Sequence, residues 1–296
     1  MRFKASLRVR VGKLVARLGD PRFDPECFYL PRDELLGFVA IPADPQFRIG
    51  TRQSAKSRVA TIIGHDVSDH EINDARTPTP AFYIARYPVT VAQFGVFVTA
   101  TGAGPRDLRA LRDPDSQPVR YIAWREAMAY CRWLHQSLVG GSALTGCEAA
   151  RLVHDGAWQV SLPSEPEWEV AARGGQRESV FPWGDTPDPN AANYKDSGIE
   201  DTSPVGCFPA NGFGLHDMIG NVSEWTRSLW TIDYSQVNDP NLDDLEARDD
   251  QARGVRGGSW LGHRGYARCA YRGWSLPEHR SAYLGFRVVL RTSPVS

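Results

Sequence analysis

Thiols and imidazoles are the side chains with which proteins most often bind soft metals or attack a substrate. The sequence has five cysteines, an odd number, with wide spacing and no C-x-x-C pair: Cys27, Cys131, Cys147, Cys207 and Cys269. Its seven histidines are scattered and form no cluster. This spacing predicts neither a disulfide framework nor a thiolate or histidine metal site. We expect reduced thiols, as in a cytoplasmic protein.

Composition restricts the classes of partner. The 296 residues carry 34 Lys and Arg against 35 Asp and Glu, so the overall charge does not indicate binding to nucleic acid or to a membrane surface. No apolar run approaches the roughly twenty residues of a membrane helix, and the basic first twenty residues lack the apolar core of a signal peptide. A hydrophobic content of 42% is enough for a sizeable core.

Helix signals lie in the first 175 residues. An amphipathic helix is predicted from the spacing of Leu7, Val11, Leu14, Val15 and Leu18, ending at Gly19, and we expect it to serve in packing or linkage. Further helices are predicted from Thr90 to Gly102, over residues 124–138, and from Ser164 to Gly174. Thr90 is a candidate N-cap, and Ser164 with Glu167 forms a capping box.

The rest of the sequence predicts strands and loops. A first strand is expected at Phe38–Ile41 and a closing strand at Gly285–Leu290, whereas the chain from Phe181 onward is rich in Gly, Pro, Asn, Asp and Trp. We therefore predict an N-terminal helix and linker over residues 1–35 and one domain over residues 36–293. Four tryptophans are expected to be buried and to hold irregular backbone together: Trp168, Trp183, Trp225 and Trp260.

Several short phrases occur in a set order along the chain. They are IARYPVT (84–90), LPSEPEWEVAARGG (162–175), FPWG (181–184), NGFGL (211–215), GNVSEWT (220–226), RGGSW (256–260) and GFR (285–287). This succession resembles the sulfatase-modifying, formylglycine-generating-enzyme family over roughly Leu36 to Arg291. The resemblance implies an α+β, C-type-lectin-like fold with little regular secondary structure.

The resemblance also bears on catalysis. Active members have two copper-binding cysteines, five positions apart, after a Gly-Gly-Ser-aromatic phrase. When the chain is aligned on RGGSW and on His263-Arg264, the matching residues are Gly262 and Ala267. Neither side chain can bind a metal, so we expect no copper and no catalytic residue. Cys269 is interpreted as a small buried hydrophobe.

Calcium is the metal that the resemblance favours. One family site matches side-chain ligands at Asp217 and Glu224 and backbone carbonyls at Gly220 and Val222, an all-oxygen set that suits Ca²⁺. Asn193 and Tyr194 match the start of a second site, whose other ligands cannot be placed. A structural calcium ion and a metal-free hydrogen-bonded loop are both compatible with the first segment.

The segment from Ser259 to Tyr283 looks like the variable region of proteins that are diversified by retroelements. Such proteins keep a framework, here including Trp260 and Trp274, which we expect to be buried. Between the framework residues lie the predicted ligand-binding positions: Leu261, Gly262, His263, Gly265, Tyr266, Gly273, Ser275, Leu276, Glu278, His279, Ser281, Ala282 and Tyr283. The variable region is expected to span about residues 256–290.

Codon chemistry is consistent with that interpretation. Changing the two adenines of an AAC or AAT codon never yields Lys, Gln, Glu, Met or Trp, and only Glu278 among the thirteen residues breaks this rule. The mixture of Tyr, His, Leu and small residues suits a binding surface. These residues are equally compatible with ordinary loops of a non-catalytic family member.

Three functions follow as hypotheses. The first is a non-catalytic protein that binds a protein or another macromolecule, with no nucleic acid or membrane partner. The second is a formylglycine-generating-type oxidase or related metal-dependent oxidoreductase with an unrecognised metal arrangement. The third is a sensor module of a signalling system, because residues 18–22 resemble segments that join such domains to nucleotide-triphosphatase proteins.

Overall fold

The computed structural model describes residues 3–140, 146–243, 245 and 250–292. The α-helices in these ranges are α1 Ala5–Leu18, α2 Lys56–Ile63, α3 Val91–Thr101, α4 Trp124–Gly140, α5 Glu148–His154 and α6 Glu165–Arg173. The strands are β1 Phe23–Asp24, β2 Leu30–Pro31, β3 Phe38–Ile41, β4 Phe82–Ala85, β5 Trp158–Ser161, β6 Ser223–Leu229, β7 Arg253–Arg256, β8 Arg272–Ser275, β9 Leu284–Gly285 and β10 Val289–Thr292. None of the described helices has the length and apolar character to cross a bilayer.

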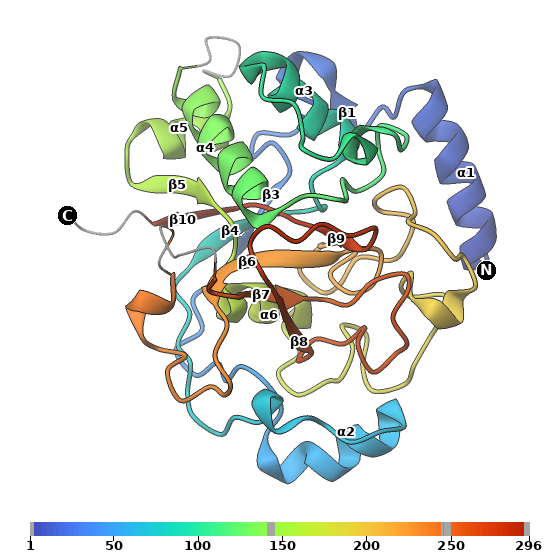
Figure 1. The fold of residues 1–296 in the computed structure, drawn as a ribbon, viewed down its shortest axis with the longest axis vertical. Coiled ribbons are helices and arrows are strands. Elements are labelled where there is room, and N and C mark those ends of the chain that lie inside the picture. Colours follow the sequence, from blue (N-terminus) through green and yellow to red (C-terminus); the bar gives the residue numbers. More distant parts are fainter. Residues whose placement is uncertain (1–2, 141–145, 244, 246–249, 293–296) are drawn as a thin grey trace.

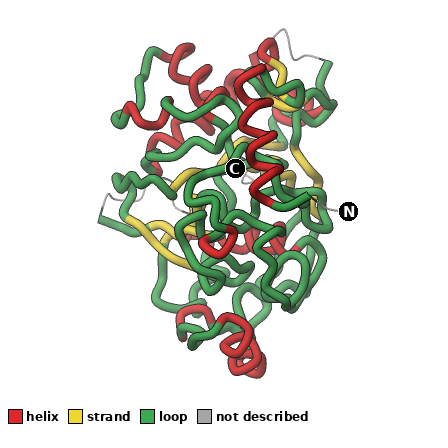
Figure 2. The backbone as a smooth tube through the Cα atoms, turned by 90° about the vertical axis from the view of Figure 1, so that its right-hand side faces the viewer, coloured by secondary structure: helices red, strands yellow, loops and turns green. Residues whose placement is uncertain are grey.

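Two small sheets form the centre of the molecule. The first has the strand order β3-β4-β10-β5 and is antiparallel, and the second has the order β8-β7-β6-β9, with β9 parallel to β6. Helices α3, α4 and α5 gather at one end of the molecule and α2 lies at the other (Figure 1). Loops make up most of the chain between them, as Figure 2 shows. This mixed, loop-rich architecture is the one that the resemblance implied.

Capping accounts for the bounds of two helices. The Thr90 side chain accepts a hydrogen bond from the Gln93 amide (3.3 Å), and the Gln93 side chain accepts one from the Thr90 amide (2.9 Å). Ser164 and Glu167 make the same reciprocal pair at α6. Each pair satisfies backbone donors that a helix start leaves unpaired, which confirms the predicted starts of α3 and α6.

Helix α1 forms where it was predicted but packs on a different face. Its small residues Ala5, Val9 and Ala16 are buried, with Phe208 in the same cluster, whereas Leu7 and Leu14 are exposed. Close approach to the loop around Phe208 requires small side chains, so the larger apolar residues point outward. The expectation that α1 packs through its leucines is therefore wrong.

The predicted closing strand is divided between the two sheets. Residues 284–285 pair with β6 in the second sheet, and β10 pairs with β4 and β5 in the first. The connecting residues hold fully buried Arg287, whose guanidinium binds Glu224 of β6. A single strand would not bring Arg287 to that carboxylate, so the continuous strand expected from the sequence is wrong.

The core is built around aromatic side chains, as expected for irregular backbone. Trp168 and Trp225 are 0% exposed, and Trp183 and Trp260 are half-buried. The indole nitrogen of Trp225 donates to the carbonyl of Ile122 (2.8 Å), so its polar atom is satisfied inside the core. Burial of Trp168 and Trp225 confirms half of the predicted tryptophan core.

Candidate ligand-binding face

The structure exposes five of the thirteen predicted ligand-binding residues, namely Leu261, Tyr266, Leu276, His279 and Tyr283. Seven more are half-buried: Gly262, His263, Gly273, Ser275, Glu278, Ser281 and Ala282. Gly265 is buried, and a Cβ built on it would overlap the His65 ring. The predicted surface therefore exists over most of its length, and the placement of Gly265 on it is wrong because His65 covers that position.

A hollow of about 370 Å³ lies beside β8 and joins part of this segment to other regions of the chain. The segment contributes Gly265, Tyr266 and Gly273, together with Tyr271 and Trp274. The opposite wall consists of residues far away in sequence: His65, Ser68, His70, Glu71 and Trp230. Its size and its aromatic lining are typical of a binding pocket with a few polar groups.

The aromatic side chains of the hollow support one another. The Tyr266 ring lies 4.3 Å from the His263 ring and 5.1 Å from the Tyr271 ring, measured between centroids. His65 contacts both His263 (5.2 Å) and Tyr266 (6.3 Å). Burial, followed by the charge of neighbouring His65, lowers the pKa of His263, which favours its neutral form. The cluster thus presents aromatic rings held in place at a solvent-exposed position.

Trp274 was expected in the core but is 58% exposed, so that prediction is wrong. It lies on β8, the edge strand of the second sheet, where it pairs with Gly254 of β7. Along the strand Arg272 is buried and Trp274, two residues later, is exposed, so burial ends within β8. Trp274 is therefore a surface aromatic residue that sequence reasoning missed.

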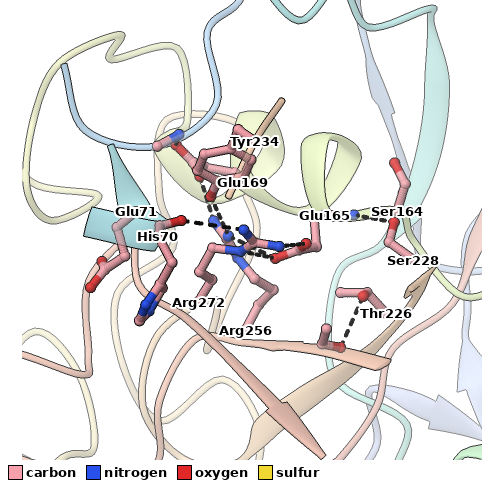
Figure 3. Close-up of polar contacts among 12 residues, drawn as sticks. His70, Glu71, Ser164, Glu165, Glu169, Thr226, Ser228, Tyr234, Arg256 and Arg272 are labelled. Atoms are coloured by element: carbon pink, nitrogen blue, oxygen red, sulfur yellow. Dashed lines mark hydrogen bonds and ion pairs between the residues drawn. The ribbon is translucent and has the colours of Figure 1, made fainter. Parts of the chain in front are cut away.

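A buried ionic cluster fixes β8 beneath this surface (Figure 3). Arg272 Nη2 lies 2.6 Å from Glu165 Oε2, and Arg256 pairs with Glu165 (3.3 Å) and with Glu169. Burial alone raises the pKa of Glu165, but the charges of Arg272 and Arg256 outweigh it and hold that pKa below its usual value. Glu165 is therefore ionised, and its ion pairs anchor both β7 and β8 to α6.

Arg272 also orders aromatic residues next to the hollow. Its guanidinium carbon lies 4.1 Å from the centroid of the Trp230 ring and 4.3 Å from that of Tyr234. Trp230 in turn contacts His70 edge-on at 5.2 Å. Cation–π contacts of this kind stabilise both partners when they are shielded from water. His65, His70 and Trp230 come from other loops and carry no periodic signal, so only the tertiary structure identifies them as part of the wall.

The remaining predicted positions lie along the chain away from the hollow. Glu278 forms ion pairs with Arg106 (3.1 Å) and Arg125 (3.9 Å), which attach it to the residues before and within α4. His279 closes a turn, with its amide donating to the carbonyl of Leu276. Leu261 and Leu276 are 54% and 47% exposed. We name the surface formed by the predicted ligand-binding positions other than Gly265, together with Tyr271 and Trp274, the variable face.

The two positions that match the copper-binding cysteines lie in different surroundings. Gly262 is half-buried, and its carbonyl accepts a hydrogen bond from the Lys195 amide (2.9 Å). Ala267 is buried in the core, as is Cys269. Burial raises the pKa of the Cys269 thiol to about 12, so it is protonated at neutral pH and is a poor metal ligand.

The side chains predicted to bind calcium already have hydrogen-bond and ion-pair partners within the protein. Both oxygens of Glu224 bind the guanidinium of Arg287 at 2.8 Å, and Oε2 also accepts from the indole nitrogen of Trp168 (2.7 Å). Arg287 Nη2 further donates to the carbonyls of His216 (3.0 Å) and Asp217 (3.3 Å). A guanidinium therefore occupies the position of a cation among these oxygens.

The other predicted ligands do not supply the negative charge that Glu224 shares with Arg287. The Asp217 carboxylate accepts a hydrogen bond from the Gly206 amide (2.7 Å), and burial raises its pKa. Gly220 lies in a backbone bridge with Asn193. Within the described residues there is no group of three or more His, Cys, Asp or Glu side chains that could hold a metal. Because the two carboxylates, Asp217 and Glu224, are engaged in this way, the predicted set that they form with Gly220 and Val222 does not fit a calcium ion in this arrangement.

We expect calcium to leave thermal stability unchanged, because Arg287 already neutralises Glu224. Melting curves with millimolar calcium and with a chelator should coincide. Ligands that bind only the folded state raise the melting temperature by mass action, so a bound calcium ion would be visible in this measurement. A rise with calcium that is lost in Glu224→Gln would restore the calcium site predicted from the sequence.

The chain is similar to known proteins in both sequence and fold. Residues 44–292 match the family described as the sulfatase-modifying factor enzyme 1-like domain. The formylglycine-generating enzyme of Bos taurus is 32% identical over 200 residues, which cover 62% of this chain and 46% of that protein. The Bos taurus inactive C-alpha-formylglycine-generating enzyme 2 is 32% identical over 203 residues, or 62% of this chain and 53% of that protein. The chain thus spans about half the length of these relatives.

Solved structures agree on the fold. PvdO from Pseudomonas aeruginosa superposes with a TM-score of 0.64 at 25% identity, covering 86% of this chain and 93% of the other. Treponema denticola variable protein 1 superposes with a TM-score of 0.59 at 23% identity, covering 86% and 94%. The family match extends over most of the chain and includes the phrases that position Glu165, Glu224, Arg256 and Arg287. The chain therefore belongs to the formylglycine-generating-enzyme family and has its C-type-lectin-like fold.

Proposed function

We propose that this chain is a non-catalytic member of its family that binds a protein or another macromolecule through the variable face. We further propose that a retroelement diversifies the predicted ligand-binding positions of that face, whereas Trp274 belongs to the fixed framework. The Treponema denticola protein is named a variable protein, and its likeness to this chain supports the choice of scaffold. The inactive bovine relative supports a role without catalysis, by its name.

The observation that carries the proposal is how the variable face is attached to the scaffold. Scaffold amides bind its main-chain carbonyls: Lys195 to Gly262 (2.9 Å), Tyr121 to Ser281 (3.0 Å) and Ser223 to Tyr283 (2.7 Å). The Trp260 indole nitrogen donates to the carbonyl of Ala282 (3.3 Å). A main-chain carbonyl is present in every residue type. The side chains at these positions can therefore change while the backbone keeps its anchors.

The framework residues between them use their side chains instead. Arg268 and Arg272 are buried and paired with Glu71 and Glu165. Breaking such a buried pair leaves an uncompensated charge and costs about 3–5 kcal/mol. The same short segment thus alternates between positions that tolerate substitution and positions that do not, which is the requirement for a diversified binding surface.

The family's oxidase chemistry is the second candidate, because relatives named as formylglycine-generating enzymes are about one-third identical to this chain. The matched positions argue against it. Gly262 and Ala267 supply no thiolate, and the nearby thiol of Cys269 is buried and protonated. Copper(I) requires soft thiolate ligands, so the reaction lacks its metal site at this place.

We expect the purified protein neither to bind Cu(I) tightly nor to oxidise a cysteine-containing sulfatase peptide. The measurement is a Cu(I) competition assay with a chromogenic chelator, followed by mass spectrometry of the peptide. A matched variant, Gly262→Cys with Ala267→Cys, tests whether the positions alone limit copper binding. Stoichiometric copper binding with aldehyde formation by the unmodified protein would overturn the non-catalytic proposal.

The diversification proposal is tested in the neighbouring DNA. We expect a reverse-transcriptase gene and a near-copy of the final coding segment, with adenines at the codons of the predicted ligand-binding positions. Sequencing of this locus from several isolates should show changes at positions such as Tyr266 and His279 and none at Arg268 or Arg272. Changes spread evenly over both classes would contradict diversification and leave an ordinary family member.

A further inference from the structure

A second hollow, of about 60 Å³, opens behind the framework of the variable face. Six arginines line it: Arg48, Arg52, Arg58, Arg173, Arg177 and Arg268. Glu178 is the one carboxylate among its lining residues. Phe47, Val59 and Val180 supply apolar wall. The lining is therefore strongly cationic in a protein whose overall charge is close to zero.

The buried arginines at this hollow are fixed in place. Arg173 is 5% exposed and donates to Glu169 (2.6 Å) and to the carbonyls of Gly50 (3.0 Å) and Ser179 (3.1 Å). Arg268 is 1% exposed; it pairs with Glu71 and donates to the carbonyl of Gly265 (2.8 Å). Guanidinium groups that are already oriented lose little entropy when a ligand binds.

One buried donor has no acceptor in the described residues. Nη1 of Arg268 is shielded from solvent and makes no hydrogen bond there. A buried charged donor left unpaired is costly, and such groups are rare unless an ion or ligand completes them. An anion in this hollow or in the one beside β8, which Arg268 also lines, could accept from Nη1; Arg48, Arg52, Arg58, Arg173 and Arg177 lie at the present hollow alone.

Among the outer arginines, Arg52, Arg58 and Arg177 are exposed and Arg48 is half-buried, so their guanidiniums remain able to turn toward a ligand. Arg52 pairs with Glu178 (2.9 Å), and Arg177 pairs with Asp44 (3.2 Å), in both cases at the surface. Arg48 donates to the carbonyl of Asp74. Exposed ion pairs contribute about 0–1 kcal/mol each and exchange readily for a better acceptor. Their guanidiniums can therefore contact the oxygens of an anion in the hollow.

We infer that this hollow is a binding site for a tetrahedral oxyanion, such as inorganic phosphate or the phosphate group of a larger ligand. Several guanidiniums that approach from different segments match three charged oxygens better than the two of a carboxylate. The volume accommodates a group of that size, and the apolar wall accepts the adjoining part of an organic phosphate. Arg268 borders both hollows, but none of the predicted ligand-binding positions lines the cationic one, so phosphate binding there does not depend on their side chains.

Isothermal titration with inorganic phosphate at constant ionic strength tests the inference. We expect saturable binding of one phosphate, weakened about tenfold or more in the double variant Arg52→Ala and Arg58→Ala, since charge-assisted bonds are lost. Both side chains are exposed, so the fold should be retained, and circular dichroism checks this. Arg109→Ala, which removes a charge paired with Asp107 outside the hollow, is the matched control and should bind normally.

Each result is decisive. Equal binding by all three proteins would show non-specific surface attraction, and no binding by the unmodified protein would overturn the inference. Titration with a nucleoside monophosphate and with sulfate separates an organic phosphate from a free oxyanion. A Tyr266→Ala variant should bind phosphate normally, so failure of the proposed variable face and failure of this site are distinguishable.

Discussion

Replacement of Arg287 by alanine is expected to lower the free energy of unfolding by about 3–5 kcal/mol. Arg287 is 0% exposed, binds both oxygens of Glu224 and joins the two sheets through the carbonyl of Ala85 (2.9 Å). Its loss leaves the Glu224 carboxylate buried without a positive partner. Urea denaturation followed by tryptophan fluorescence measures the effect.

The dependence of this effect on pH identifies its cause. Burial already raises the pKa of Glu224 above its ordinary value despite Arg287. Without Arg287 we expect that pKa to rise further, so protonation will favour the folded state below it. The stability deficit of Arg287→Ala should therefore shrink as the pH falls from 7.5 to 5. A deficit independent of pH would indicate lost packing in place of an unpaired carboxylate.

A surface arginine provides the control for charge removal. Arg109 is about half exposed and pairs with Asp107 at 2.6 Å. Substitution to alanine should change stability by no more than about 0.5 kcal/mol. If Arg287→Ala behaves like Arg109→Ala, the buried pair does not hold the sheets together as we describe.

Replacement of Tyr266 and Trp274 together by alanine is expected to weaken ligand binding by at least about thirtyfold. Aromatic anchors at the centre of an interface often contribute 2 kcal/mol or more each. Both rings are exposed, at 42% and 58%, and they line the same hollow. A partner captured by the unmodified protein from a cell extract would be identified, and its Kd measured for both proteins.

The same variant should remain folded, because exposed substitutions usually change stability by about half a kcal/mol. Two control variants set the range of effects with which the double variant is compared. Leu18→Ala removes an apolar side chain that is 87% exposed on α1, outside the variable face, and should affect neither binding nor stability. Trp168→Ala should cost about 3–5 kcal/mol by leaving a cavity in the core. A folded double variant that binds its partner normally would show that the variable face is misplaced.

Local chemistry explains what could be predicted from the sequence. Helix α3 was expected from Thr90 to Gly102, and α6 from Ser164 to Gly174, because capping boxes and left-handed glycines act over four residues. The short strand β3 was also predicted from local sequence, because its own apolar residues indicate a strand. The order of motifs along the chain was also enough to recognise that Gly262 and Ala267 stand at the two copper-binding positions of the family.

Other features depend on contacts between residues that are distant in sequence. The chain alone predicted a single closing strand, whereas Arg287 reaches Glu224 only because residues 286–288 connect two sheets. Glu224 was interpreted as a calcium ligand because its segment resembles a calcium site of the family, whereas its guanidinium partner, 63 residues away, cannot be identified from the sequence. Tertiary packing thus places the positive charge of Arg287, and no metal ion, beside the Glu224 carboxylate.

The sequence by itself determined the family, the starts of α3 and α6, and a segment between Leu261 and Tyr283 whose predicted positions are exposed or half-buried except for Gly265. Only the tertiary structure decided that Trp274 faces solvent, since an edge strand has an uncovered face that its residue types do not disclose. It also decided which residues complete the wall of the hollow, because His65 and His70 follow α2 and Trp230 follows β6, far apart in the sequence. Loops have no periodicity, so their meeting point follows from the packing of the whole chain and from no local pattern.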